Sequence, residues 1–346
     1  QQATTGISAA SHPNSRVHPE LSAADSVKPV KDALESLRAA GVVAGQAAPD
    51  NGIFRGSAAL YFLGAGSPRD LLFREDTATV LGFATGGWGE GEGYPESAMG
   101  NVALLRQTFL DARWFAGAQA ADRTAYRGTE RPPSDRSLEA LGAVVNGRQG
   151  VIAESRTLLE ALRWKKVLDE AGIQKRVFVL SGEEWRRLDW VDAYLKGGTD
   201  GFILPVEYPK APKAEDEDEW LDVDVLTLDR WKNAPANPAW LAKHGITFSF
   251  TTHRLKDVGD LRGNVRKAIA AGLQESDALA ALTTRPAALL GVGDRLGTLE
   301  AGKSASFVVL DGPVFGEKSK VLETWVEGER FLVDKGGKKS RAEDAE

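Results

Sequence analysis

The sequence contains no cysteine and only four histidines among its 346 residues. Without a thiol, the chain forms no disulfide and has neither a cysteine nucleophile nor a cysteine metal ligand. With so few imidazoles, it has little material for a histidine-rich metal centre. No apolar run approaches the length that a bilayer-spanning helix needs. These absences exclude thiol chemistry and give no reason to expect a membrane span.

The chain also lacks an excess of positive charge. Its formal net charge is -6 and its pI is about 5.5, so it has no basic footprint for nucleic acid. Gly-x-Ser-x-Gly, Walker and dinucleotide-binding patterns are absent. With 42% hydrophobic and 27% charged residues, the chain is long enough for one large α/β domain with an appendage.

The first residues are Gln1-Gln2, and they are not followed by the charged-then-apolar pattern of an uncleaved signal peptide. This start is typical of a processed chain, and the absence of cysteine is compatible with an oxidising compartment. We therefore expect an exported protein, periplasmic or extracellular.

The middle of the chain alternates strand and helix patterns. Residues 1–27 are rich in Ser, Ala, Pro and Asn and predict an extended arm. Further along, apolar periodicity predicts strands at 42–47, 57–63, 150–153, 176–180, 201–204 and 246–251, with helices at 29–40, 96–121, 138–145, 157–171, 183–195 and 258–271. Alternating β and α segments imply parallel strands. About six barrel-type strands are expected.

The C-terminal stretch has a different pattern. Two short helices are expected to meet at Pro286. A strand follows at 306–310, and residues 321–326 pair with 330–333 across Glu327-Gly328 as a β-hairpin. The chain therefore ends in a small β unit.

These residues resemble a known family. The strings LTTRPAALLGVGDRLGTLEAGKSASFVVLDG (282–312), VLETWVEGERF (321–331) and VVAGQAAPDNGIFRGSAALYFLG (42–64) resemble the amidohydrolase superfamily, particularly its imidazolonepropionase-like branch. The resemblance implies an α/β fold: a TIM-like (β/α) barrel, incomplete at its N-terminal side, with a C-terminal β appendage. We expect an extended arm at 1–27, the barrel at 28–303, a β-hairpin or sandwich remnant at 304–334 and a flexible tail at 335–346.

The same resemblance implies a divalent metal site, which this sequence departs from. The family has a His-x-His pair after the first barrel strand, histidines after strands five and six, and an aspartate after strand eight. This chain has no His-x-His. The strand-five position carries Glu154 without an imidazole, and His253 occupies the aspartate position of strand eight. We therefore expect no metal ligands, and no cofactor unless the chain is active, in which case zinc or iron is implied.

Several residues remain candidates with a structural alternative. His253 is a lone metal ligand, a general base or a substituted site residue. Glu154, Glu183 and Glu207 follow successive strands and would form a carboxylate cluster, although glutamates are also ordinary first-turn residues of helices. His18 is a loop histidine or a site residue, and His12 and His244 are expected to be exposed. His253 and Glu154 are the two candidate catalytic residues. The tryptophans within helix patterns are expected to pack rather than to bind ligand.

The function expected from these observations is that of a catalytically degenerate amidohydrolase-like protein, a structural or binding subunit of a larger assembly. The alternative is an active metal-dependent amidohydrolase that cleaves a C–N bond of a cyclic amide or a related substrate. Expected partners are another chain or a second copy, with room for a small-molecule ligand. Nucleic acid is not expected as a partner.

Overall fold

The computed structural model describes residues 11–28, 30–83, 94–124, 132–212 and 223–333. Within them, seven strands form one sheet in chain order from β1 to β7, and three form a second sheet in the order β10-β9-β8. The strands of the large sheet are β1 (Ala44–Ala47), β2 (Phe54–Phe62), β3 (Leu72–Gly82), β4 (Gly150–Glu154), β5 (Arg176–Val179), β6 (Gly201–Pro205) and β7 (Ser249–Thr251). The α/β fold expected from the sequence is confirmed.

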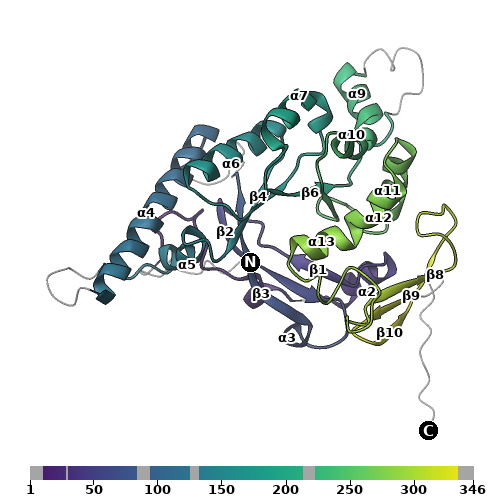
Figure 1. Cartoon of the computed structure of the whole chain (residues 1–346), viewed down its shortest axis with the longest axis horizontal. Coiled ribbons are helices and arrows are strands. Elements are labelled where there is room, and N and C mark those ends of the chain that lie inside the picture. The colour runs from purple at the N-terminus through teal and green to yellow at the C-terminus, as the bar shows by residue number, and fades with distance from the viewer. Residues whose placement is uncertain (1–10, 29, 84–93, 125–131, 213–222, 334–346) are drawn as a thin grey trace, which may run out of the picture.

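The large sheet changes from antiparallel to parallel pairing at β3. Strands β1, β2 and β3 pair antiparallel, whereas β3 to β7 pair in parallel. Parallel neighbours need crossover connections, which helices provide. Figure 1 shows these helices along the outer side of the strands. The connections are α4 (Ala98–Thr124), α5 (Arg136–Val145), α6 (Leu158–Glu170), α7 (Leu188–Trp190), α9 (Val225–Asn233) and α10 (Asn237–Lys243).

Capping side chains fix where several helices begin. Thr157 accepts a hydrogen bond from the Glu160 amide at the start of α6, and Asp135 accepts two amides at the start of α5. Residues 183–195, predicted as one helix, are instead divided into a 3-10 turn η1 (Glu184–Arg187), the short α7 and a π-helical turn η2 (Val191–Leu195). The remaining helices are α1 (Ala23–Ser26), α2 (Lys31–Ala39), α3 (Pro68–Leu71), α11 (Asp260–Ala270), α12 (Glu275–Leu282) and α13 (Thr284–Leu289).

The main core lies between the sheet and the helices. All nine residues of β2 are buried, and Phe54, Trp164 and Phe178 are completely enclosed. Each such side chain contributes about 1.5–3 kcal/mol by leaving water. The described part of the N-terminal arm joins this core, because Val17 is fully buried and bridges to Phe54. The arm therefore runs along β2.

The small sheet is attached through α2. Its strands are β8 (Phe307–Leu310), β9 (Val321–Val326) and β10 (Glu329–Leu332), all antiparallel. The Arg38 guanidinium, which is buried, donates to the Leu63 carbonyl and lies 4.2 Å from the Phe331 ring. Thr324 donates to the Arg38 carbonyl. The small C-terminal β unit predicted from the sequence is confirmed.

The large sheet curls without closing within the described residues. Its order runs from β1 to β7 with no pairing between these two end strands. Helices α12 and α13 pack against β7, the strand at one end of the sheet. The result is a half-barrel of seven strands, one more than the six expected, because β3 was not predicted. No described helix is long and apolar enough to cross a membrane.

Candidate functional site

The two candidate catalytic residues meet at the carboxyl ends of the parallel strands. Glu154 is the last residue of β4, and His253 lies two residues beyond β7. His253 Nε2 is 3.0 Å from Glu154 Oε1. Strands β5 and β6 lie between β4 and β7, so this contact requires the curl of the sheet. Active sites of (β/α) barrels form at this strand edge.

Arg55, from β2, completes one side of the contact. Its Nη1 donates to Glu154 Oε2 at 2.5 Å, and its Nε donates to the Gly52 carbonyl at 3.2 Å. To reach Glu154, the guanidinium passes β3 at Gly82, which stands opposite Glu154 in the register. A Cβ at Gly82 would collide with the Arg55 guanidinium. Glycine at this position therefore gives Arg55 its path to Glu154.

Arg254 closes the other side. Its Nη2 lies 3.5 Å from Glu154 Oε1 and donates to the Ser155 carbonyl at 2.7 Å, while Nη1 donates to the Ser181 carbonyl at 3.3 Å. The backbone of Arg254 is left-handed, with φ of +74°, which is uncommon for a residue other than glycine. This side chain ties the ends of β4 and β5 to the loop after β7. Arg55, Glu154, His253 and Arg254 are called the Glu154 cluster below.

The Glu154 carboxylate is ionised. The hydrogen bond with His253 and the hydrogen bond and charge of Arg55 lower the pKa of Glu154 far below its ordinary range, against the opposing effect of burial. An ionised carboxylate can only accept hydrogen bonds, so Nε2 of His253 carries the proton that they share. His253 is the most accessible member, with 49% of its side chain exposed against 12% for Glu154.

The cluster offers a divalent metal ion at most one carboxylate and one imidazole. A zinc or iron ligand must offer a free lone pair. Each oxygen of Glu154 accepts a hydrogen bond, Oε2 from Arg55 and Oε1 from His253, so a metal ion would compete with these donors. In the described ranges, no group of three or more His, Cys, Asp or Glu side chains converges where a metal ion would be held.

The other candidate carboxylates do not join the cluster. Glu183 forms ion pairs with Arg186 and Arg230, and Glu207 is exposed. The sequence analysis did not single out the neighbouring residue Glu184. Its buried carboxylate accepts from the Ser181 hydroxyl at 2.6 Å and from Asn237 Nδ2 at 2.8 Å. Glu184 therefore holds the turn after β5 to α10.

The other histidines have local partners. His18 lies 3.2 Å from Glu20 and 2.9 Å from the Ser15 carbonyl, as expected of a loop histidine. His244 lies 2.8 Å from Asp192. His12 and His244 are half-buried rather than exposed, because His12 packs under α5 through a backbone bond to Ser137 and His244 pairs with η2.

Trp164 of α6 packs beside the end of β4 and bonds to the backbone of Glu154. It is completely buried in α6, its ring centroid is 4.3 Å from that of Phe83, and its indole Nε1 donates to the Glu154 carbonyl at 2.9 Å. This is the packing role expected for helical tryptophans. Trp231 differs, since it is 44% exposed on α9, and Trp220 lies outside the described residues.

Two buried hydroxyls follow the strand ends without a hydrogen-bond partner among the described residues. They are Ser155 Oγ, directly after Glu154, and the Tyr208 hydroxyl beyond β6. Burial raises the pKa of the Tyr208 hydroxyl, which stays protonated. Both groups are neutral donors close in sequence to the strand-end edge.

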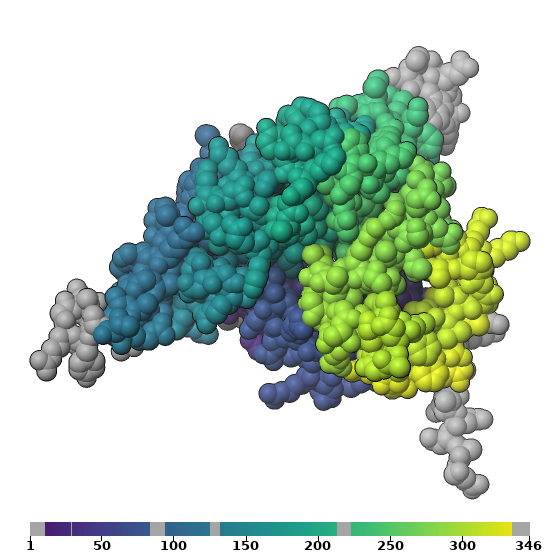
Figure 2. All heavy atoms as spheres, in the orientation of Figure 1, coloured from purple at the N-terminus to yellow at the C-terminus, as the bar shows by residue number. Residues whose placement is uncertain are grey.

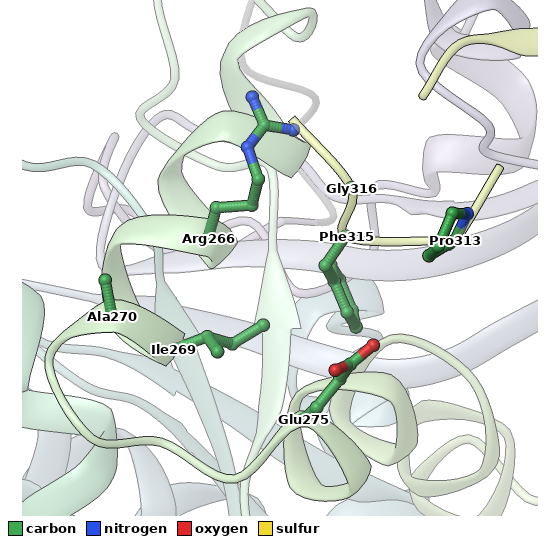
Figure 3. Close-up of a pocket in the computed structure, with 7 residues that line it drawn as sticks. All are labelled: Arg266, Ile269, Ala270, Glu275, Pro313, Phe315 and Gly316. Carbon is green, nitrogen blue, oxygen red and sulfur yellow. The ribbon is translucent and has the colours of Figure 1, made fainter. Parts of the chain in front are cut away.

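A separate cavity of about 370 Å³ lies between α11, the start of α12 and the loop after β8. Figure 3 shows Ile269 and Phe315 lining it from the helix and from the loop, with Arg266 above and Glu275 below. None of its lining residues belongs to the Glu154 cluster. The cavity is therefore distinct from the strand-end site.

Comparison with known proteins finds a family match in the C-terminal part of the chain. Residues 232–334 match the sequence model described as "Amidohydrolase family". A stretch of 57 residues is 42% identical to "Amidohydrolase tasK" of Hapsidospora irregularis. It covers 16% of this chain and only 6% of that protein, so the match spans a small fraction of the relative's length.

The whole fold has a solved counterpart. The crystal structure of an amidohydrolase from Thermotoga maritima MSB8 superposes with a TM-score of 0.73 over 92% of this chain and 79% of that chain. Sequence identity is 20%, so this likeness establishes the fold alone.

Proposed function

We propose that this member of the amidohydrolase superfamily is catalytically degenerate and serves as a structural or binding subunit of a larger assembly. The observation that carries the proposal is the Glu154 cluster. Two guanidinium groups and an imidazole surround one carboxylate at the strand edge where such barrels carry out chemistry. The guanidinium groups of Arg55 and Arg254 therefore surround the carboxylate at the edge where the family would hold its metal ion.

The chemistry of metal-dependent hydrolysis explains why this matters. A divalent ion lowers the pKa of a bound water and polarises the scissile carbonyl. Arg55 and Arg254 supply positive charge without an open coordination position, and they cannot accept a proton from water. His253 is left as a single half-exposed imidazole. The proposal is therefore that this face does not activate water through a metal.

The same charges favour an anionic ligand if the face binds a small molecule. The Glu154 cluster holds two guanidinium groups against one carboxylate, so the local field is positive before any charge on His253 is counted. Thermal denaturation with small mono- and dicarboxylates tests this. Stabilisation that is lost in Arg254→Ala supports a binding subunit. Stabilisation that persists in that variant places the ligand away from the Glu154 cluster.

Assembly with another polypeptide or a second copy is part of the proposal. In the described residues the half-barrel ends at β1 and β7, and β7 is only three residues long. Open sheet edges pair readily with other strands. Light scattering of the isolated chain, together with a structure of the assembly, tests whether these edges are covered by a partner. A stable monomer with a closed barrel would contradict it.

An active hydrolase of a cyclic amide is the competing function. It is favoured by the position of His253 and Glu154 at the strand-end edge and by the family match of residues 232–334. Purified protein should be incubated with five- and six-membered cyclic amides in the presence of Zn²⁺, Fe²⁺ or Mn²⁺. We expect equal background rates for wild type and His253→Ala. His244→Ala is the matched control, since His244 also pairs with a carboxylate but lies outside the cluster. Turnover that disappears only in His253→Ala would establish the hydrolase.

A further inference from the structure

The chain contains two Asn-Gly pairs, Asn51-Gly52 and Asn146-Gly147. Both asparagines are exposed, and both glycines have a left-handed backbone, with φ of +96° at Gly52 and +69° at Gly147. Helix α5 ends directly before the second pair, and Figure 2 shows the α4–α5 region at the surface, on the side away from the small sheet. Access to water therefore does not distinguish the two pairs.

An asparagine that precedes glycine cyclises without an enzyme. The glycine nitrogen gives its proton to solvent base and attacks the asparagine Cγ. An N–Cγ bond forms, the Cγ–Nδ2 bond breaks, and the side-chain nitrogen takes up a proton and leaves as ammonia. Water then opens the cyclic imide at either carbonyl carbon, which gives aspartate or isoaspartate with no oxidation or reduction. Glycine favours the attack because it has no Cβ to crowd its nitrogen.

The Gly147 amide, which would have to attack Asn146, is held by the end of α5. It donates a hydrogen bond to the Val144 carbonyl at 3.0 Å. The next two amides along the chain both donate to the Ala143 carbonyl, at 2.9 and 3.0 Å. Bonds of this kind satisfy the last carbonyls of a helix. Freeing the Gly147 nitrogen therefore requires local opening of the helix end.

The Gly52 amide has no hydrogen-bond partner among the residues that the structure describes, and neither has the Asn51 side chain. The amides that follow are held, since Ile53 and Phe54 both donate to the Arg16 carbonyl, at 2.8 and 3.1 Å. Gly52 itself takes part through its carbonyl, which accepts from Arg55. The Gly52 nitrogen therefore attacks Asn51 without first giving up a hydrogen bond.

We propose that Asn51 is a modification site, at which the chain converts to aspartate and isoaspartate without an enzyme, and that the hydrogen-bonded Gly147 protects Asn146. A net hydrogen-bond contribution of ordinary size corresponds to roughly tenfold in rate. In the folded chain, Asn51 should therefore react at least ~10-fold faster than Asn146.

The product matters because the same loop positions Arg55. The Gly52 carbonyl accepts from Arg55 Nε at 3.2 Å, and the same guanidinium donates to Glu154. Isoaspartate carries the main chain through its Cβ, which inserts one extra backbone atom directly before Gly52. The Gly52 carbonyl is then displaced from Arg55, and the Glu154 cluster loses one of its fixed bonds. The modification depends on these bonds alone and is independent of the function proposed above.

Peptide mapping by mass spectrometry measures both reactions in one sample. The full chain is incubated in mildly alkaline buffer, digested at intervals under denaturing conditions, and scored for aspartate and isoaspartate at positions 51 and 146. A parallel sample in concentrated urea is the matched control, because unfolding frees both glycine amides. We expect the two rates to differ by at least ~10-fold in buffer and to become similar in urea.

Two results would overturn the assignment of the modification site. One is an Asn146 rate equal to or above that of Asn51 in buffer. The other is a preference for Asn51 that keeps the same size in urea, because the adjoining sequence and not the fold would then set it.

Asn51→Gln tests the effect on the Glu154 cluster, because glutamine has to form a larger ring and reacts far more slowly. After equal incubation, wild type should lose about 1–2 °C of melting temperature relative to a fresh sample, as for one lost hydrogen bond. Asn51→Gln should lose none. Equal losses in the two chains would refute the link between Asn51 and Arg55.

Discussion

The two edges of the parallel sheet both carry arginine–carboxylate networks, but the networks differ in balance. At the amino edge, Arg176 begins β5 and lies between Asp169 and Asp200, with Lys165 also within reach of both. Two cations meet two carboxylates there. At the carboxyl edge, Arg55 and Arg254 meet Glu154 alone, and His253 adds a half-exposed imidazole.

This difference separates a structural network from a candidate site. At the amino edge, Asp200 is 2% exposed and every charge has an opposite partner, as expected of a group that only holds strands together. At the carboxyl edge, backbone carbonyls of Ser155 and Ser181 take the place of the missing carboxylate. The uneven charge and the accessible imidazole are the basis for proposing an anionic ligand at this edge.

Removing one carboxylate from each edge gives the largest expected contrast. Glu154→Gln leaves the buried Arg55 guanidinium without a counter-charge, and breaking a buried pair in this way costs about 3 kcal/mol. Asp200→Asn leaves Arg176 paired with Asp169, so about 1 kcal/mol is expected. Urea unfolding of both variants measures the two losses of stability. Equal losses would show that the two networks are equivalent.

Gly82→Ala tests the path of Arg55 to Glu154. The added methyl group collides with the guanidinium, and overpacking of this kind costs about 2 kcal/mol. The loss should shrink when Arg55→Ala is present in the same chain, which a double-mutant cycle measures. Gly142→Ala is the control: nothing lies within 4 Å of its Cβ position in α5, so alanine should stabilise by about 0.5 kcal/mol. Additive effects at positions 82 and 55 would contradict the assigned contact.

Acid should distinguish the carboxyl edge with a smaller effect. The pKa of Glu154 is lower in the folded chain than its ordinary value of 4.5, so ionised Glu154 stabilises the fold above pH 4.5. As pH falls below 4.5, the unfolded chain binds a proton first, and this group's contribution declines by roughly 1 kcal/mol per pH unit. The difference in unfolding free energy between wild type and Glu154→Gln should therefore narrow in acid. A constant difference from pH 7 to pH 3 would rule out a lowered Glu154 pKa.

The sequence led to part of the candidate site. Glu154 and His253 were found because both follow strand patterns, and carboxyl ends of parallel strands share one edge. Arg55 was missed because it lies within an antiparallel strand and reaches Glu154 only through the gap at Gly82. Such a path depends on three strands at once. The only signal in the sequence was Gly82 at the end of an apolar run. Its role can be inferred only once the register of β3 against β4 is known.

The fold shows the same limit. Regular strands and helices from 150 to 180 were predicted within one or two residues, because their apolar periodicity is uninterrupted. Strand β3 was missed, since Arg74, Glu75 and Asp76 break its pattern at the exposed half. The single helix predicted for 183–195 is broken where the buried Glu184 accepts backbone amides of the preceding turn. Hydrogen bonds of the Glu184 side chain set the conformation of that segment. The apolar periodicity of the sequence contains no sign of these bonds.

Elemental analysis of the purified chain tests the central claim most directly. After incubation with Zn²⁺, Fe²⁺ or Mn²⁺ and removal of excess ion, the account predicts well below one tightly bound metal per chain, equal in wild type and His253→Ala. His244→Ala serves again as the control for a histidine with a carboxylate partner. One zinc, iron or manganese per chain that is lost on mutating His253 would contradict the degenerate site and restore the metal-dependent hydrolase.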